Sequence, residues 1–318
     1  MMEVVAMTRI IQPSLPKTRK KGFGAWLNRE TTAGFVFSLP FILGFLMFML
    51  IPMALSLYYS FCKYDIQSPS NWIGLDNYVK IFTRDDVFKK ALGVTCYFAL
   101  IGTPLKVVFA LIVALILNHE TKAVPFYRAT YYLPSIIGGS VAVAILWRRL
   151  FESNGTINAL LSKIIPGLEG YNWFSEGPAI WVLIILTVWQ FGSSMLIFLS
   201  ALKQIPRELY EASWVDGANG IRQFFSVTLP LLTPTVFFNL VQQMINSFLA
   251  FTQSKLITNG APRNSTLFYT VYQYNRAFPT TGKSQMGYAS ALAWVMLVIV
   301  SLVTGLLFWS RSKWVYDD

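Results

Sequence analysis

One segment of this sequence has the residue types to bind a phosphate group. Residues 277–284 read Ala-Phe-Pro-Thr-Thr-Gly-Lys-Ser and end in the Gly-Lys-Ser that would place backbone amides and an ammonium around a nucleotide phosphate. A functional phosphate loop begins with Gly, follows a strand and opens a helix of an α/β fold. This segment begins with Ala277 and precedes a long apolar run. We therefore interpret it as a chance match, not a nucleotide site.

Other catalytic or metal-binding chemistry lacks the residues it needs. His119 is the single histidine, and a proton relay or metal site would need partners spaced around it. The two cysteines, Cys62 and Cys96, form neither a disulfide framework nor a zinc pattern. No Ser/His/Asp or Cys/His arrangement is evident. We expect a protein that is not an enzyme and that binds no metal or cofactor itself.

Polar side chains inside long apolar runs are the more informative candidates, because such residues face a helix bundle or a water-filled path. Candidates in the run near 235–257 are joined by candidates beside an aromatic ring in the run near 179–202: Asn239, Gln242, Gln243, Asn246, Ser247, Gln253, then Gln190, Ser193, Ser194 and Phe191. Helical spacing puts Asn239, Gln242, Asn246 and Gln253 on one face. They fit either hydrogen bonding between helices or contact with sugar hydroxyls.

Lys106 lies near the centre of another apolar run, where a lysine costs roughly 2.5–3.5 kcal/mol on insertion scales. It must therefore face protein or water. One interpretation is hydrogen bonding to carbonyls freed by Pro104. The other is a positive wall for an acidic solute.

These residues must be positioned by membrane-spanning helices. The chain has 318 residues, of which 54% are hydrophobic and 13% charged, against about 25% charged in soluble domains. Six apolar runs are long enough to span a bilayer: 33–59, 91–117, 127–147, 179–202, 235–257 and 286–309. We predict an all-α integral membrane protein with six transmembrane helices. The net charge of +11 is scattered between the runs, which argues against nucleic-acid binding.

A basic arm at residues 1–30 precedes the membrane domain at 31–318. Lys and Arg are almost evenly divided between the two sides, so the arm alone favours a cytoplasmic N-terminus. With six spans, the C-terminus is then cytoplasmic too.

The segment 203–234 is a polar interruption between two runs. Pro206 can start a helix, Gly217 can end it, and Asn219 can cap a second helix. Pro230 and Pro234 are expected to break or kink the entry to the next span. The pattern predicts a helix–turn–helix on the membrane face.

This segment also resembles a known motif. Glu211-Ala212-Ser213, Asp216-Gly217-Ala218, Phe224 and Val227-Thr228-Leu229-Pro230 are similar to the EAA loop of ABC importer permeases. The flanking residues 201–210, and Thr258-Asn259-Gly260, resemble the carbohydrate branch that includes the maltose and glycerol-phosphate permeases. The resemblance runs from about residue 30 to the end. One departure is Ser213, where the family often has Ala, and it is also small.

The resemblance implies a permease subunit of a binding-protein-dependent ABC importer in the bacterial inner membrane. Its expected partners are a second homologous permease, two cytoplasmic ATPase subunits that bind ATP and Mg, and an extracytoplasmic solute-binding protein. The implied coupling residues are Glu211, Ala212, Ser213, Asp216, Gly217 and Ala218. The implied substrate path comprises Gln190, Phe191, Ser194, Gln243, Asn246 and Ser247. The basic outer face favours an acidic oligosaccharide such as a uronate fragment, with glycerol phosphate and neutral sugars left open.

An ion-coupled secondary carrier is the alternative. It would need ionisable groups inside its spans. No Asp or Glu lies in any proposed span, which disfavours it.

Overall fold

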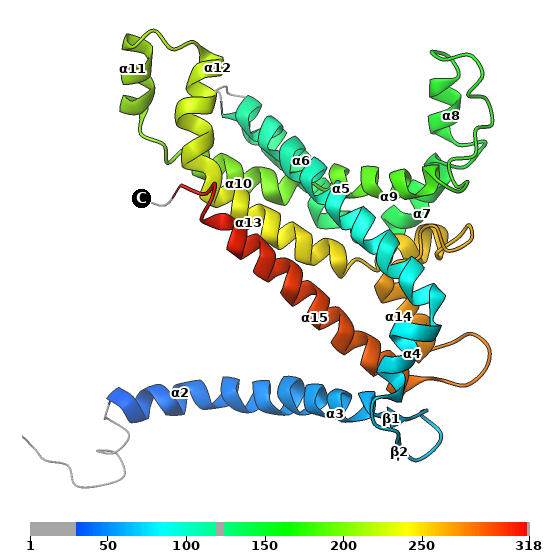
Figure 1. The fold of residues 1–318 in the computed structure, drawn as a ribbon. Coiled ribbons are helices and arrows are strands. Elements are labelled where there is room, and N and C mark those ends of the chain that lie inside the picture. Colours follow the sequence, from blue (N-terminus) through cyan, green and yellow to red (C-terminus); the bar gives the residue numbers. More distant parts are fainter. Residues whose placement is uncertain (1–29, 119–123, 317–318) are drawn as a thin grey trace, which may run out of the picture. The chain divides into compact units, whose positions relative to one another are not determined.

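The computed structural model describes residues 30–118 and 124–316 and is mostly helical (Figure 1). Two short strands, β1 Cys62–Lys63 and β2 Asn71–Trp72, pair antiparallel with Cys62 opposite Trp72. The chain divides into two compact units, Met1–Ser56 and Leu57–Asp318. The basic arm at 1–29 and His119 lie outside the described residues.

The described part of the first unit is one apolar helical segment. It comprises α2 Glu30–Phe45, the π-helical turn η1 Leu46–Leu50, and the start of α3 Ile51–Ser60. Its apolar side chains are exposed on all faces, as suits a helix surrounded by lipid or by other helices. The span predicted at 33–59 agrees with the apolar stretch Gly34–Ser60.

The second unit is built around one long helix, α5. Its helices in chain order are α4 Asp76–Arg84, α5 Asp86–Leu117, α6 Val124–Ile137, α7 Val141–Leu150, α8 Thr156–Leu161, α9 Pro178–Trp189, α10 Gly192–Leu202, α11 Arg207–Val215, α12 Gly220–Gln223, η2 Phe224–Thr228, α13 Leu229–Phe248, η3 Ser254–Thr258, α14 Tyr269–Ala277 and α15 Met286–Arg311. Helices α9, α10, α13 and α14 pack against α5. The main core includes Phe98 of α5, Leu183 of α9 and Phe248 of α13.

Four described helical segments are long and apolar enough to cross a membrane, at Gly34–Ser60, Asp86–Leu117, Gly220–Phe248 and Met286–Arg311. Two further segments are bent pairs: α6 with α7 at 100°, and α9 with α10 at 42°. The predicted six is reached when each pair counts as one span. The expected single helix at 127–147 is wrong, because Ser140 caps a new helix by accepting a hydrogen bond from the Val143 amide.

The predicted bounds of the span at 235–257 are also wrong, and Pro230 and Pro234 do not break the helix. The helical segment is unbroken from Gly220 to Phe248, across Pro230 and Pro234, and then stops. Just before Pro230 the π-helical turn η2 has the Leu229 amide bonded to the Phe224 carbonyl, five residues back. This wider turn accommodates the proline ring within a continuous helix. Because the helix ends at Phe248, Gln253 does not share a helical face with Asn239.

One glycine sets how closely α10 approaches α6. A Cβ built on Gly192 would lie 2.4 Å from the Tyr131 carbonyl oxygen and 2.7 Å from the Tyr132 Cα, both backbone atoms that cannot rotate away. A Cβ on Gly305, inside α15, would meet nothing within 4 Å. Both glycines are helical, so the same substitution has opposite steric consequences at the two positions.

We expect Gly192→Ala to lower the free energy of unfolding by about 1–3 kcal/mol, the usual cost of forcing atoms into a packed interface. Gly305→Ala should be neutral or slightly stabilising, because alanine favours helix over glycine. Thermal unfolding of the two variants in the same detergent would measure this. Equal midpoints for both variants would contradict the close packing at Gly192.

Candidate functional site

A buried polar cluster joins three helices of the second unit. The Lys106 ammonium on α5 donates a hydrogen bond to Gln243 Oε1 on α13 at 2.9 Å. The Gln243 Nε2 donates to Ser194 Oγ on α10 at 3.2 Å. Beside them, the Thr103 and Ser247 hydroxyls lie 2.9 Å apart. All five side chains are buried, with Lys106 9% exposed.

Helical spacing explains how the cluster forms. Thr103 and Lys106 are three residues apart on α5, and Gln243 and Ser247 are four apart on α13, so each pair shares a face. The primary amide of Gln243 can accept and donate at once, which lets it connect a cation to a hydroxyl. The structure thus brings together four residues that the sequence singled out separately.

Gln190 and Phe191 lie at the bend between α9 and α10. The Gln190 side chain donates to the Gly138 carbonyl at 3.0 Å, at the break between α6 and α7. The Ser135 hydroxyl donates to the Gln190 carbonyl at 3.1 Å and accepts from the Ser193 amide at 3.0 Å. These bonds tie the two bends to one another, so Gln190 has a structural role here. Among the described residues, it makes no hydrogen bond to the Lys106 cluster.

Aromatic rings lie one helical turn from this cluster. Phe191 is buried, and its ring centroid is 4.9 Å from that of Phe109 and 6.0 Å from that of Tyr131. Phe109 follows Lys106 by three residues on α5, and Phe109 and Tyr131 are both partly exposed. Asn246 differs from its neighbours on α13, because its side chain is exposed and makes no hydrogen bond to another described residue.

The predicted helix–turn–helix at 203–234 is present as α11 and α12. The Ala218 amide bonds to the Ser213 carbonyl at 2.9 Å, the Gly217 amide bonds to the Trp214 carbonyl at 2.9 Å, and Gly217 has φ of +78°. This is the Schellman pattern that closes a helix with glycine. Asn219 caps α12 as predicted, accepting from the Arg222 amide at 2.9 Å.

The turn projects from one end of the second unit, away from α14 (Figure 1). Glu211, Ala212, Asp216 and Gly217 are exposed, Ser213 is half-buried with its hydroxyl on the Tyr210 carbonyl at 2.8 Å, and Ala218 is buried. Large apolar side chains surround them, with Trp214 76% and Val215 86% exposed. Exposed apolar area of this kind marks a surface that another protein can cover.

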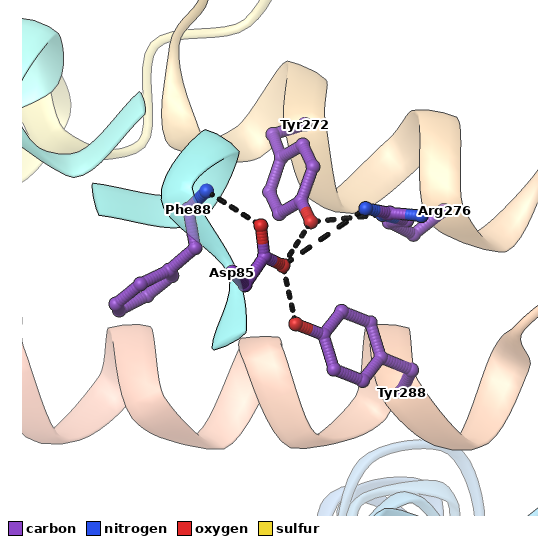
Figure 2. Close-up of polar contacts among 5 residues, drawn as sticks. All are labelled: Asp85, Phe88, Tyr272, Arg276 and Tyr288. Atoms are coloured by element: carbon purple, nitrogen blue, oxygen red, sulfur yellow. Dashed lines mark hydrogen bonds and ion pairs between the residues drawn. The ribbon is translucent and has the colours of Figure 1, made fainter. Parts of the chain in front are cut away.

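A second polar cluster, which no sequence pattern predicted, is centred on Asp85 (Figure 2). Asp85 caps α5 by accepting from the Phe88 amide at 2.9 Å, and its other oxygen accepts hydrogen bonds from Tyr272 and Tyr288. Arg276 donates to the Tyr272 hydroxyl at 2.8 Å and lies 4.0 Å from Asp85. Asp85 is only 5% exposed, and its hydrogen bonds hold the start of α5 against α14 and α15. We call this cluster the Asp85 clamp.

The charges of this clamp follow from its contacts. Burial by itself would raise the pKa of Asp85, but the hydrogen bonds from Tyr272, Tyr288 and the Phe88 amide, with the Arg276 charge, hold that pKa below its usual value. Burial and the bond to Asp85 raise the pKa of Tyr272 to about 12. The carboxylate is therefore ionised and both phenols are donors at neutral pH.

The segment 277–284 does not form a phosphate loop. It starts at the end of α14 and runs as a loop to α15, so it follows a helix instead of a strand. The Ser284 hydroxyl donates to the Ala277 carbonyl at 2.7 Å. Among the described residues, no group of His, Cys, Asp and Glu side chains could hold a metal ion.

Comparison with known proteins identifies the class. Residues 86–314 match the family described as the binding-protein-dependent transport system inner membrane component. The chain belongs to this family and is a carbohydrate-type ABC importer permease, a multi-pass membrane protein. Membership of this family argues against the alternative hypothesis that the chain is an ion-coupled secondary carrier.

Individual relatives agree with that class. The chain is 50% identical over 296 residues to a probable ABC transporter permease of Bacillus subtilis, YesP, covering 92% of this chain and 94% of that one. It is 31% identical to a probable permease for starch degradation products from Thermoanaerobacterium thermosulfurigenes, AmyD, covering 92% and 96%. A solved bacterial ABC transporter that imports the acidic polysaccharide alginate has the same fold, with a TM-score of 0.71 at 23% identity, covering 88% of this chain and 96% of the matched one.

The Asp85 clamp can be tested beside a matched control. Asp85→Asn should lower the free energy of unfolding by roughly 2–4 kcal/mol. The reason is that the Phe88 amide, Tyr272 and Tyr288 lose the buried carboxylate that accepts their hydrogen bonds. Asp86→Asn should change it by less than about 0.5 kcal/mol, because Asp86 is exposed and pairs only with Lys89 at the surface. Thermal unfolding in detergent at neutral pH measures both.

The depressed pKa of Asp85 also fixes the sign of the pH dependence. Its stabilising effect is present above the carboxyl's unfolded pKa and is lost as pH falls through the lower folded value. Wild type and Asp85→Asn should therefore approach equal stability in strongly acidic solution. A stability gap that stays constant with pH would contradict the assignment.

Proposed function

We propose that this chain forms half of the transmembrane pore of an ABC importer for an oligosaccharide. A second, homologous permease forms the other half, two separate ATPase subunits bind ATP and Mg in the cytoplasm, and an extracytoplasmic binding protein delivers the sugar. The family and its sugar-transporting relatives support this assembly. In this arrangement both chain termini face the cytoplasm.

The closed turn at 213–218 carries the coupling part of the proposal. It is a rigid turn that exposes small residues, an acidic side chain at Glu211, and the apolar side chains of Trp214 and Val215. Small residues allow a close backbone approach, and exposed apolar area suits a groove in a soluble partner. Docking there couples closure of the ATPase dimer to movement of the permease helices.

The cluster around Gln243 is the proposed substrate-path element in this chain. Amide and hydroxyl groups suit sugar hydroxyls, and nearby aromatic rings suit the apolar face of a sugar ring. Asn246 presents its amide outward from α13, while Gln243, Ser194 and Ser247 form the buried layer behind it. Alternating access then requires α13 to move with the coupling turn.

The coupling turn can be tested with one substitution at two glycines. Gly217→Asp places a side chain at a positive φ and should reduce sugar-dependent ATP hydrolysis and uptake more than tenfold, with less ATPase recovered in the complex. Gly220→Asp adds the same charge three residues on, at the start of α12, where an acidic residue is favoured and nothing lies within 4 Å of a Cβ. It should transport normally.

Both variants should remain in the membrane with wild-type yield. Normal transport and ATPase binding by Gly217→Asp would overturn the coupling assignment. Loss of transport in both variants equally would point to added charge instead of turn geometry.

The substrate path can be tested with Gln243→Ala and Asn246→Ala. Each should weaken sugar uptake severalfold while assembly with the ATPase is retained. Asn246→Ala removes an exposed amide partner for sugar hydroxyls, and Gln243→Ala removes the side chain that holds Lys106 and Ser194 in position. Leu249→Ala, at an exposed apolar position just past α13, is the matched truncation. Unchanged uptake kinetics in both amide variants would remove them from the path.

A further inference from the structure

We infer that Lys106 and the aromatic rings beside it form a subsite for a carboxylate-bearing sugar ring, so that the transported oligosaccharide is acidic; this rests on the proposed sugar-importing function. An ammonium near the middle of a membrane-spanning helix is costly and marks a functional position. Lys106 occupies such a position in α5, and 9% of its surface stays exposed in this chain.

The partners of Lys106 within this chain are incomplete. An ammonium has three donors, and the described residues provide one acceptor, Gln243 Oε1 at 2.9 Å. No Lys106 ion pair with a carboxylate is present in the described part of the chain. Apart from Asp86 at the start of α5, the described spanning helices contain no Asp or Glu. The positive charge therefore lacks a counter-charge that an anionic group would supply.

The Gln243 amide fixes where the ammonium lies. Its Nε2 donates to Ser194 Oγ, so its oxygen is turned toward Lys106 and accepts from the ammonium. Ser194 is fully buried, which makes this orientation resistant to water. Lys106 is thus held in place by a neutral group that leaves its charge uncompensated.

The aromatic rings complete the subsite. Phe109 lies one helical turn from Lys106 on α5, and Phe191 lies just before α10, three residues before Ser194. The rings of Phe109 and Phe191 meet edge to face. Phe109 and Tyr131 expose ring surface that the apolar face of a sugar can cover. A cation and a ring face one turn apart match a uronate residue, whose carboxylate projects from a partly apolar ring.

The test uses the complete importer in proteoliposomes, with pairs of trisaccharides that differ only in charge. Each pair is an oligouronate of galacturonic, glucuronic or mannuronic acid and its methyl ester. The readouts are uptake and saccharide-stimulated ATP hydrolysis. Wild type should prefer the acid in at least one pair, and Lys106→Met should reduce that preference at least tenfold while retaining uptake of the neutral ester.

Two further variants make the result specific. Lys106→Arg keeps the charge and should retain most of the preference for the acid. Lys89→Met removes a positive charge from an exposed site at the start of α5 and should leave the preference unchanged. Recovery of the assembled complex by size-exclusion chromatography checks folding for each variant.

The outcomes separate this inference from the function on which it rests. A wild type that prefers no acidic member, or a preference unchanged in Lys106→Met, overturns the inference while saccharide transport stands. If Lys106→Met and Lys106→Arg both fail to assemble with the second permease, a carboxylate of that subunit is the counter-charge and the inference is again overturned. A complex that carries none of the saccharides counts against the proposed cargo itself.

Discussion

The absence of water in the hydrocarbon of a membrane is the constraint on which this structure depends. Every backbone amide and carbonyl in a span must find a partner inside the protein. Continuous helices such as α5 satisfy most of these groups by themselves, whereas the two bent pairs release backbone groups where they break. The side chains of Ser135 and Gln190 satisfy those groups, on the Gln190 and Gly138 carbonyls and the Ser193 amide. These side-chain hydrogen bonds to the freed backbone groups therefore stabilise both bends.

The same constraint applies to the two buried charges, Asp85 and Lys106, which differ in how they are compensated. Asp85 receives hydrogen bonds from an amide and two phenols, with Arg276 nearby, so its charge is compensated within the chain. Lys106 has one neutral acceptor and no carboxylate among the described residues. A compensated charge at the end of a helix stabilises an assembly of helices, whereas an uncompensated one within a span is retained at a cost in stability. That contrast agrees with a structural role for the Asp85 cluster and supports our inference that Lys106 contacts the cargo.

Features that depend on neighbouring residues in the chain could be predicted from the sequence. The apolar runs located the first, second and last spans to within a few residues, and Gly217 and Asn219 predicted the closed turn and its cap. The breaks at 138–140 and after Phe248 were missed, because hydropathy counts apolar residues and is insensitive to a capping Ser140 inside an apolar stretch. Asp85 was missed for another reason. Its phenol partners lie 187 and 203 residues away, so only the folded chain brings them together.

The unbroken helix from Gly220 to Phe248 connects the two proposed functional regions mechanically. Its 29 residues correspond to about 40 Å at the usual helical rise. The coupling turn precedes one end, and Gln243 and Asn246 lie near the other. Had Pro230 broken this segment, displacement at the turn would be absorbed at a hinge. The π-helical turn η2 keeps the prolines inside a continuous helix. In the proposed mechanism, this helix carries a displacement at Gly217 to the side chain of Gln243.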